Sequence, residues 1–318
     1  SKKAAVMEYM ATQEGKNYLV TNLVAEVANS YYELIALDSQ LKNLEQNIEI
    51  QKNALKIVTL LKESARTTQL AVKRFEAEVQ KNQSEIYNLK QEIVETENKI
   101  NFLVGTTPQT ILRNSDNFIN LQPKVVNMGL PSDLLENRPD IKQAQLELEA
   151  AKLNIKVAKA NFYPQFGLKA GLGYEAFNPK FLLNTPQSLL YSVVGDAFMP
   201  LVNRNAIKAT YKTASAKQIQ SVYEYEQTVL KAYTEVVNQL SKIDNLENSF
   251  KLKNMQVTAL NESIEIANQL FLSARADYME VLLTQRDALE AKTALIETRK
   301  NQMLTVINLY KALGGGWN

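Results

Sequence analysis

The sequence contains neither cysteine nor histidine. Their absence excludes disulfides, thiol nucleophiles, Ser-His and Cys-His catalysis and nearly all zinc sites. A catalyst built from carboxylates, lysine and serine would still be possible, but no motif supports one. We therefore expect no catalytic residues, no cofactor and no metal site, and an enzyme is the least expected class of function.

A charge imbalance is also missing. Lys and Arg number 36 against 34 Asp and Glu, for a net charge of +2, so nothing predicts a nucleic-acid partner. No run of about 18 apolar residues occurs, which predicts that no helix spans a membrane. No signal peptide is visible at Ser1, and the chain begins inside helical sequence. We expect that residue 1 is not the natural start of the protein.

Glycine and proline are absent from residues 16–104 and 201–313. Apolar residues recur there every seven positions, which is typical of long coiled-coil helices. The columns are Val20, Val27, Leu34, Leu41, Ile48, Leu55; Val72, Val79, Ile86, Ile93, Ile100; Val229, Val236, Ile243, Phe250, Val257, Ile264, Phe271; and Leu282, Leu289, Ile296, Met303, Tyr310. A helix from 201 to 271 would be about 100 Å long. A compact domain of this chain length has a radius of gyration of only about 20 Å, so the pattern favours an elongated protein.

Each helical stretch breaks once and ends at a glycine, Gly105 or Gly314, which is a common C-terminal cap. We therefore predict a mainly α fold with a small β part, made of long antiparallel coiled-coil hairpins. The predicted segments are a helical hairpin at 1–104 with its tip near 64–71, a connector at 105–138, a helix at 139–163, a strand hairpin at 164–200, a helical hairpin at 201–313 with its tip near 273–280, and a tail at 314–318.

The period changes to two at Gln165. Apolar Phe166, Leu168, Leu172 and Tyr174 alternate there with glycines, Lys169 and Glu175, which indicates a strand with two unlike faces. A second strand is expected at about 189–199. Nine tilted residues would rise roughly 23 Å, close to the apolar band of an outer-membrane barrel. An ordinary amphipathic hairpin packed on a soluble core remains an equal alternative on this pattern alone.

The two helical hairpins align without a gap. Ser64-Ala65-Arg66 matches Ser273-Ala274-Arg275, an offset of 273 − 64 = 209, and Gly105 matches Gly314 at the same offset. Matching tips and ends predict an internal duplication. Only the second copy is preceded by a helix and strand hairpin, so we expect an equivalent pair upstream of Ser1. Four strands per chain and three chains would give twelve, within the range of about 8 to 26 for bacterial barrels.

Four motifs give the chain a resemblance to the TolC-type outer-membrane efflux channels, closest to the branch that is usually lipid-anchored. Residues 129–141 read Gly-Leu-Pro-Ser-Asp-Leu-Leu-Glu-Asn-Arg-Pro-Asp-Ile, the most family-specific of the four together with the end of the chain, 309–317. Residues 161–166 resemble the family's entry into its third strand, and 276–282 its second periplasmic tip. The resemblance implies an N-terminally truncated protomer of that family.

That resemblance implies a homotrimer with a transmembrane β-barrel in the outer membrane of a Gram-negative bacterium and an α-barrel in the periplasm. A mixed belt would draw on residues 105–140 and the tail. Outer-membrane lipid, a periplasmic adaptor and an inner-membrane transporter would be the partners, and conduction would be passive. Phe166, Leu168, Leu172 and Tyr174 would face lipid, whereas Lys169 and Glu175 would face the lumen.

The family's tips close the tube, and the match assigns Glu280 to an acidic ring with Asp277 close by. Arg66 and Arg275 could pair with acids there. Solvated turn residues are the simpler alternative, since exposed ion pairs contribute only about 0–1 kcal/mol. Ala65 and Ala274 replace a common tip glycine, and Ala71 replaces a frequent aspartate, which weakens the acidic ring at the first tip. A structural coiled-coil scaffold or a periplasmic adaptor are the rival functions.

Overall fold

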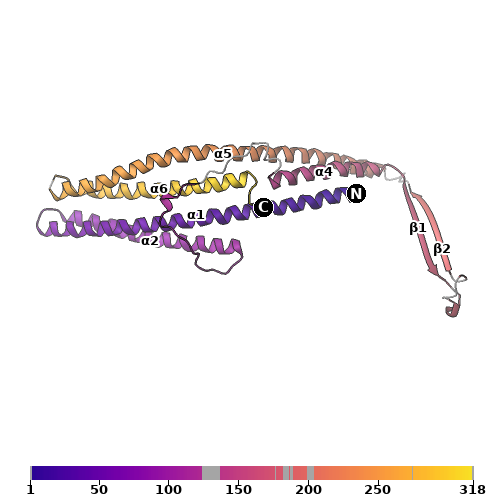
Figure 1. Ribbon diagram of the computed structural model, residues 1–318, viewed down its shortest axis with the longest axis horizontal. Coiled ribbons are helices and arrows are strands. Elements are labelled where there is room, and N and C mark those ends of the chain that lie inside the picture. The colour runs from indigo at the N-terminus through magenta and orange to yellow at the C-terminus, as the bar shows by residue number, and fades with distance from the viewer. Residues whose placement is uncertain are drawn as a thin grey trace. The chain divides into compact units, whose positions relative to one another are not determined.

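The computed structural model describes residues 2–123, 137–175, 177–181, 186, 189–198, 204–273 and 275–316. Its elements are α1 (Lys2–Glu63), α2 (Gln69–Val104), the 3-10 turn η1 (Phe118–Asn120), α4 (Pro139–Ala160), β1 (Gln165–Tyr174), the 3-10 turn η2 (Pro179–Phe181), β2 (Leu189–Phe198), α5 (Arg204–Leu272) and α6 (Tyr278–Ala312) (Figure 1). The predicted fold class, helical hairpins with a small β part, is confirmed. Much of the connector motif that starts at Gly129 lies outside the described residues, as do Ala274 and Trp317.

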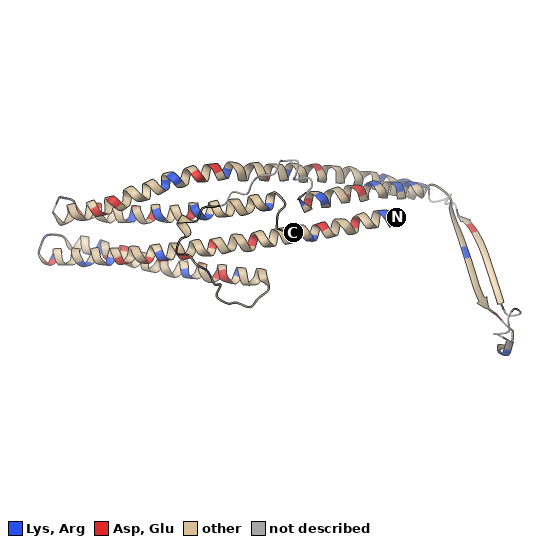
Figure 2. Cartoon of the chain, viewed as in Figure 1, with Lys and Arg blue, Asp and Glu red and all other residues tan. Residues whose placement is uncertain are grey.

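The chain divides into two compact units. One comprises Ser1–Gly15 and Pro139–Leu230, with α4 and both strands; the other comprises Lys16–Arg138 and Lys231–Asn318, with both helical hairpins. Within the described residues, no helix combines the length and apolarity needed to cross a membrane. Charges of both signs are interleaved along the helices, as expected of solvated helix faces (Figure 2).

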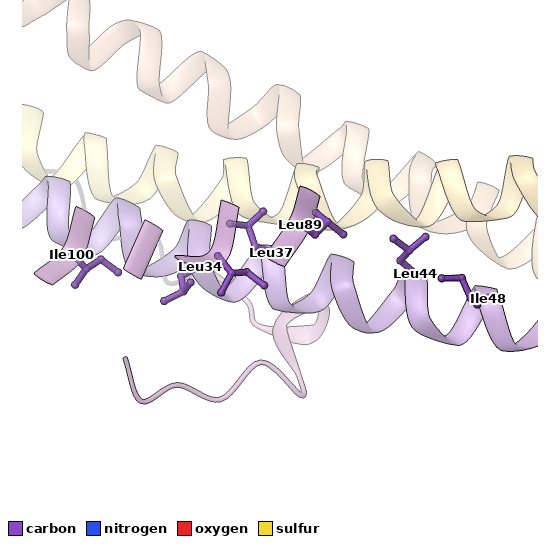
Figure 3. Close-up of a cluster of buried hydrophobic side chains, with 7 residues drawn as sticks. Leu34, Leu37, Leu44, Ile48, Leu89 and Ile100 are labelled. Atoms are coloured by element: carbon purple, nitrogen blue, oxygen red, sulfur yellow. The ribbon is translucent and has the colours of Figure 1, made fainter. Parts of the chain in front are cut away.

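The first hairpin, α1 with α2, is held by its apolar heptad positions. Leu34, Leu37, Leu44 and Ile48 of α1 form one buried cluster with Leu89, Ile93 and Ile100 of α2 (Figure 3). A second cluster nearer the turns joins both hairpins, because Val58 and Phe75 pack there with Ala267 and Val281. The two turns therefore lie at the same end of this unit (Figure 1).

A pair of buried amides meets between α1 and α2. Gln51 continues the buried column Leu37–Leu44, and Asn82 stands between Phe75 and Leu89 in the column of α2. Both side chains are buried, and the Asn82 amide donates to Gln51 Oε1 at 2.9 Å. This bond satisfies one group of each buried amide, so the pair matches α1 to α2 at one specific position.

The internal duplication is visible in the backbone at both ends of the hairpins. After α1 the Arg66 N–H donates to the Leu61 carbonyl at 2.8 Å, and after α5 the Arg275 N–H donates to Leu270 at 2.9 Å. Gly105 and Gly314, with φ of 73° and 85°, each follow a second helix and close it with equivalent bonds. A glycine adopts this left-handed conformation without the strain that a Cβ would add.

The described part of the connector packs on the hairpins. Phe118 is buried with Ile35 and Ala36 of α1 and Ile296 and Met303 of α6. The Arg113 guanidinium donates through Nη2 to Asp38 Oδ1 at 2.9 Å, and its Nη1 pairs with Glu97. These contacts tie the segment after Gly105 to three helices.

Arg138 joins α5 to the C-terminal end of α6. It is only 4% exposed, and its Nη1 donates to Glu235 Oε2 on α5 at 2.9 Å and to the Ala312 carbonyl at the end of α6 at 3.0 Å. A carbonyl left open by a helix C-terminus is thereby satisfied, and a positive charge lies at the negative end of the helix dipole. Pro139 follows at once and begins α4 in the other unit.

Candidate functional site

The two strands form one antiparallel ladder from the pair Gln165–Phe198 to the pair Tyr174–Leu189. Paired residues share a face, so the register puts the apolar residues of both strands together. That face carries Phe166, Leu168, Ala170, Leu172, Tyr174, Leu189, Tyr191, Val193 and Ala197. Leu168 and Leu172 are each 78% exposed, so this apolar face has no cover within the described residues.

The opposite face of the ladder is mixed. It carries three glycines and the polar residues Lys169, Ser192 and Asp196, but also Leu190, Val194 and Phe198. Lys169 Nζ lies 3.8 Å from Asp196 Oδ2 of β2, and Ser192 pairs with Gly171. A Cβ on Gly167 would stand 2.0 Å from Asp196 Oδ1, so glycine makes room for that carboxylate. Glu175 follows the last residue of β1 and is exposed. The hairpin thus has one largely apolar face, and the charged residues of the ladder, Lys169 and Asp196, lie on the other.

The four candidate tip residues lie in the turns and at the start of α6. Arg66 and Arg275 occupy equivalent turn positions and are exposed. Asp277 is the N-cap of α6 but makes no side-chain cap bond, whereas its counterpart Thr68 accepts a bond from the Ala71 N–H. Glu280 lies in the first turn of α6 and is exposed. These carboxylates stand at the positive end of the α6 dipole, where a negative side chain stabilises a helix.

The two turns are adjacent, but the candidate charges are not paired. In the described part of the chain, none of Arg66, Arg275, Asp277 and Glu280 makes an ion pair with another residue. A polar contact between the hairpins at this end runs from Arg74 Nη1 to Met279 Sδ at 3.5 Å. The side chains of the four candidates are therefore available to charges outside the chain.

Several residues that shape this unit did not emerge as candidates from the sequence. Arg138 lies inside a family motif, but its contacts with Glu235 and Ala312 join positions far apart in the chain. Nothing in the sequence around Arg113 and Arg299 distinguished these two arginines from the solvent-exposed charged residues of the helices. Gln51 and Asn82 could have been found as polar interruptions of heptad columns.

Helical hairpins in two copies, joined to a strand pair with an uncovered apolar face, are the features of an outer-membrane channel protomer. Solved structures agree: the outer-membrane channel OprN matches 99% of this chain and 71% of its own with a TM-score of 0.92 at 22% identity. Residues 130–315 match the model of the outer membrane efflux protein family, and the chain belongs to that family. It is an exit channel of the outer membrane of Gram-negative bacteria, with most of the chain in the periplasm.

Two relatives are named for different cargoes. The cation efflux system protein CusC of Escherichia coli O6:H1 is 28% identical over 318 residues, which cover 99% of this chain and 68% of CusC. A crystal structure of CusC aligns with a TM-score of 0.88 at 27% identity, over 99% of this chain and 73% of that one. The pyoverdine export outer membrane protein OpmQ of Pseudomonas aeruginosa is 25% identical, over 99% of this chain and 66% of OpmQ. Members of this family are transport proteins.

Proposed function

We propose that the protein works as a homotrimer whose subunits surround a water-filled duct, and that it conducts small molecules passively out of the periplasm. The uncovered apolar face around Leu168 and Leu172 carries this proposal, because a face so exposed needs lipid or protein against it. Exposed apolar residues also line α5, among them Leu252, Met255 and Ile266. Such side chains on a long helix suit packing against a neighbouring subunit.

In the proposed arrangement, the face of Phe166, Leu168, Leu172 and Tyr174 lies against outer-membrane lipid. Lys169, with Glu175 beyond the strand end, then faces the water of the lumen. The alternation supports this assignment, since lipid-facing and lumen-facing residues alternate along strands of membrane barrels. The ion pair of Lys169 with Asp196 is compatible with water on that side.

The proposed partners are a periplasmic adaptor and an energy-supplying inner-membrane transporter, with no chemical step performed by this chain. The absence of histidine and cysteine from the sequence supports the lack of catalysis. One relative is named for cations and another for pyoverdine, although both align over nearly this entire chain. We infer that the cargo is selected by the transporter rather than by this duct.

We further propose that the turns at Arg66 and Arg275, with Asp277 and Glu280, form the periplasmic gate. Their exposure and their lack of intrachain ion pairs within the described residues support pairing across subunits. One exposed pair contributes at most about 1 kcal/mol, so threefold repetition would bias the closed state by up to about 3 kcal/mol. A bias of this size suits a gate that a partner protein opens.

The gate is tested by conductance of the full-length trimer in planar bilayers. We expect Glu280→Ala and Arg275→Ala each to raise the conductance, because each removes charges that hold the turns together. Glu92→Ala changes an exposed carboxylate on α2 away from the turns and serves as the control. If both tip variants conduct like the unmodified trimer, Glu280 and Arg275 are not part of the gate. Conduction by the unmodified trimer would still support the proposed duct.

A further inference from the structure

Arg299 of α6 is a buried cation without a carboxylate partner among the described residues. It is only 7% exposed; its Nε donates to the Ile119 carbonyl at 2.8 Å and its Nη1 to Gln302 Oε1 at 2.8 Å. The guanidinium carbon lies 3.7 Å from the centre of the Phe250 ring. Burial lowers the pKa of Arg299 below its ordinary value, which reflects the cost of holding this charge away from water.

A guanidinium has five N–H donors, and these two bonds use two of them. The remaining three have no partner in the part of the chain that the structure describes. If Arg299 served only to hold η1 against α6, its Nε bond to the Ile119 carbonyl would be enough. The Nη2 group makes neither of these bonds and is not among the enclosed polar atoms without a partner, so it reaches accessible space where it can meet an acceptor.

A cavity of about 410 Å³ opens beside Arg299 in the same unit. Apolar side chains of Ile243, Phe250 and Val306, with Pro123, form much of its wall. Its charged residues are Arg299, Lys251 and Glu247, and the last two pair with each other at 2.6 Å. The site thus carries a net charge of +1, and its volume lies in the range of about 300–1,000 Å³ typical of small-molecule sites.

We propose that this cavity binds a small amphipathic monocarboxylate, with its carboxylate on the guanidinium of Arg299 and its apolar body against Phe250, Ile243 and Val306. The Nη1 and Nη2 end of an arginine can hold both oxygens of one carboxylate. One negative charge neutralises the site. A phosphate dianion would exceed that charge and would meet the carboxylate of Glu247, so a carboxylate is the better match.

The proposal is tested by isothermal titration of the full-length protein with sodium octanoate, with octanol as a neutral probe of the same chain length. We expect octanoate to bind and octanol to bind at least about tenfold more weakly, because the charged contact is missing. Lys251→Glu reverses one charge at an exposed position and should weaken octanoate binding at least about tenfold without unfolding the protein. Arg299→Lys keeps the charge but loses the planar fork, and should also weaken binding.

Arg286→Gln provides the matched control, since Arg286 lies on the same helix, is exposed and does not line this cavity. Its octanoate affinity should equal that of the unmodified protein. Equal binding of octanoate and octanol, or unchanged octanoate binding in Lys251→Glu, would overturn the proposal. Neither result bears on conduction by the trimer.

Discussion

At the scale of single residues, Ala65 has a left-handed backbone with φ of 54° in the turn after α1. A Cβ in this conformation costs about 1 kcal/mol or more, which glycine avoids. We expect Ala65→Gly to raise the free energy of unfolding by about 0.5–1 kcal/mol. Urea unfolding followed by circular dichroism measures the change.

The control is Ala77→Gly, at an exposed position inside α2. There the same replacement should lower the free energy of unfolding by about 1 kcal/mol, because glycine is a poor helix former. If Ala65→Gly and Ala77→Gly changed the free energy of unfolding in the same direction, the left-handed conformation of Ala65 would not explain the effect of its replacement.

Arg113 is the second residue whose replacement has a definite expected effect. Hydrogen bonding to Asp38 raises the pKa of Arg113 above its ordinary value even though burial opposes the charge. Arg113→Gln leaves the carboxylates of Asp38 and Glu97 largely buried without their cation, and we expect a loss of about 3 kcal/mol. Lys42→Gln breaks the exposed pair with Asp116 and should cost less than about 1 kcal/mol. Equal losses in the two variants would contradict this account of Arg113.

At the scale of elements, the strand ladder offers a direct test of its two faces. Arginine at the bilayer midplane of a barrel's lipid face costs about 2–4 kcal/mol. We therefore expect Leu168→Arg to reduce the fraction of protein that inserts into lipid vesicles, measured by flotation. Ser192→Arg places the same side chain on the opposite face of β2 and should insert normally. Equal insertion of both variants would reject the assignment of the faces.

Elements are also the level at which the sequence is most informative. The heptad columns and the glycine ends predict the helices, because a period of seven and a left-handed cap are local properties. The alternation from Phe166 to Tyr174 predicts β1 for the same reason. The contacts of Arg113 with Asp38 and of Arg299 with Ile119 were not predictable, because they depend on how the connector folds back onto helices distant in sequence.

At the scale of the whole molecule, the proposed trimer predicts how the protein behaves in solution. The full-length protein should require detergent and should show a protein mass of three chains in light scattering, because its apolar strand face needs cover. Dilution in detergent should leave that mass unchanged if the interfaces are extensive. A monomer under these conditions would contradict the trimer.

The sequence of a single chain is enough to indicate its family, but it is not enough to establish the proposed gate. Motifs such as the run from Gly129 to Ile141 indicate the family by their residues alone, and the match over residues 130–315 confirms it. The roles of Arg66, Arg275, Asp277 and Glu280 stay predictions, because the proposed gate would be formed by several subunits. The sequence of one subunit does not determine which charges face each other across them.

The hydrogen bond between Gln51 and Asn82 has a mechanical consequence for any motion of the first hairpin. Sliding α2 along α1 by one turn would break this bond and leave two buried amides without each other as partners. Such a step is costly, whereas swinging the two helices together leaves the bond intact. We therefore expect the first hairpin to move as one rigid body, with hinges in the segments at its ends.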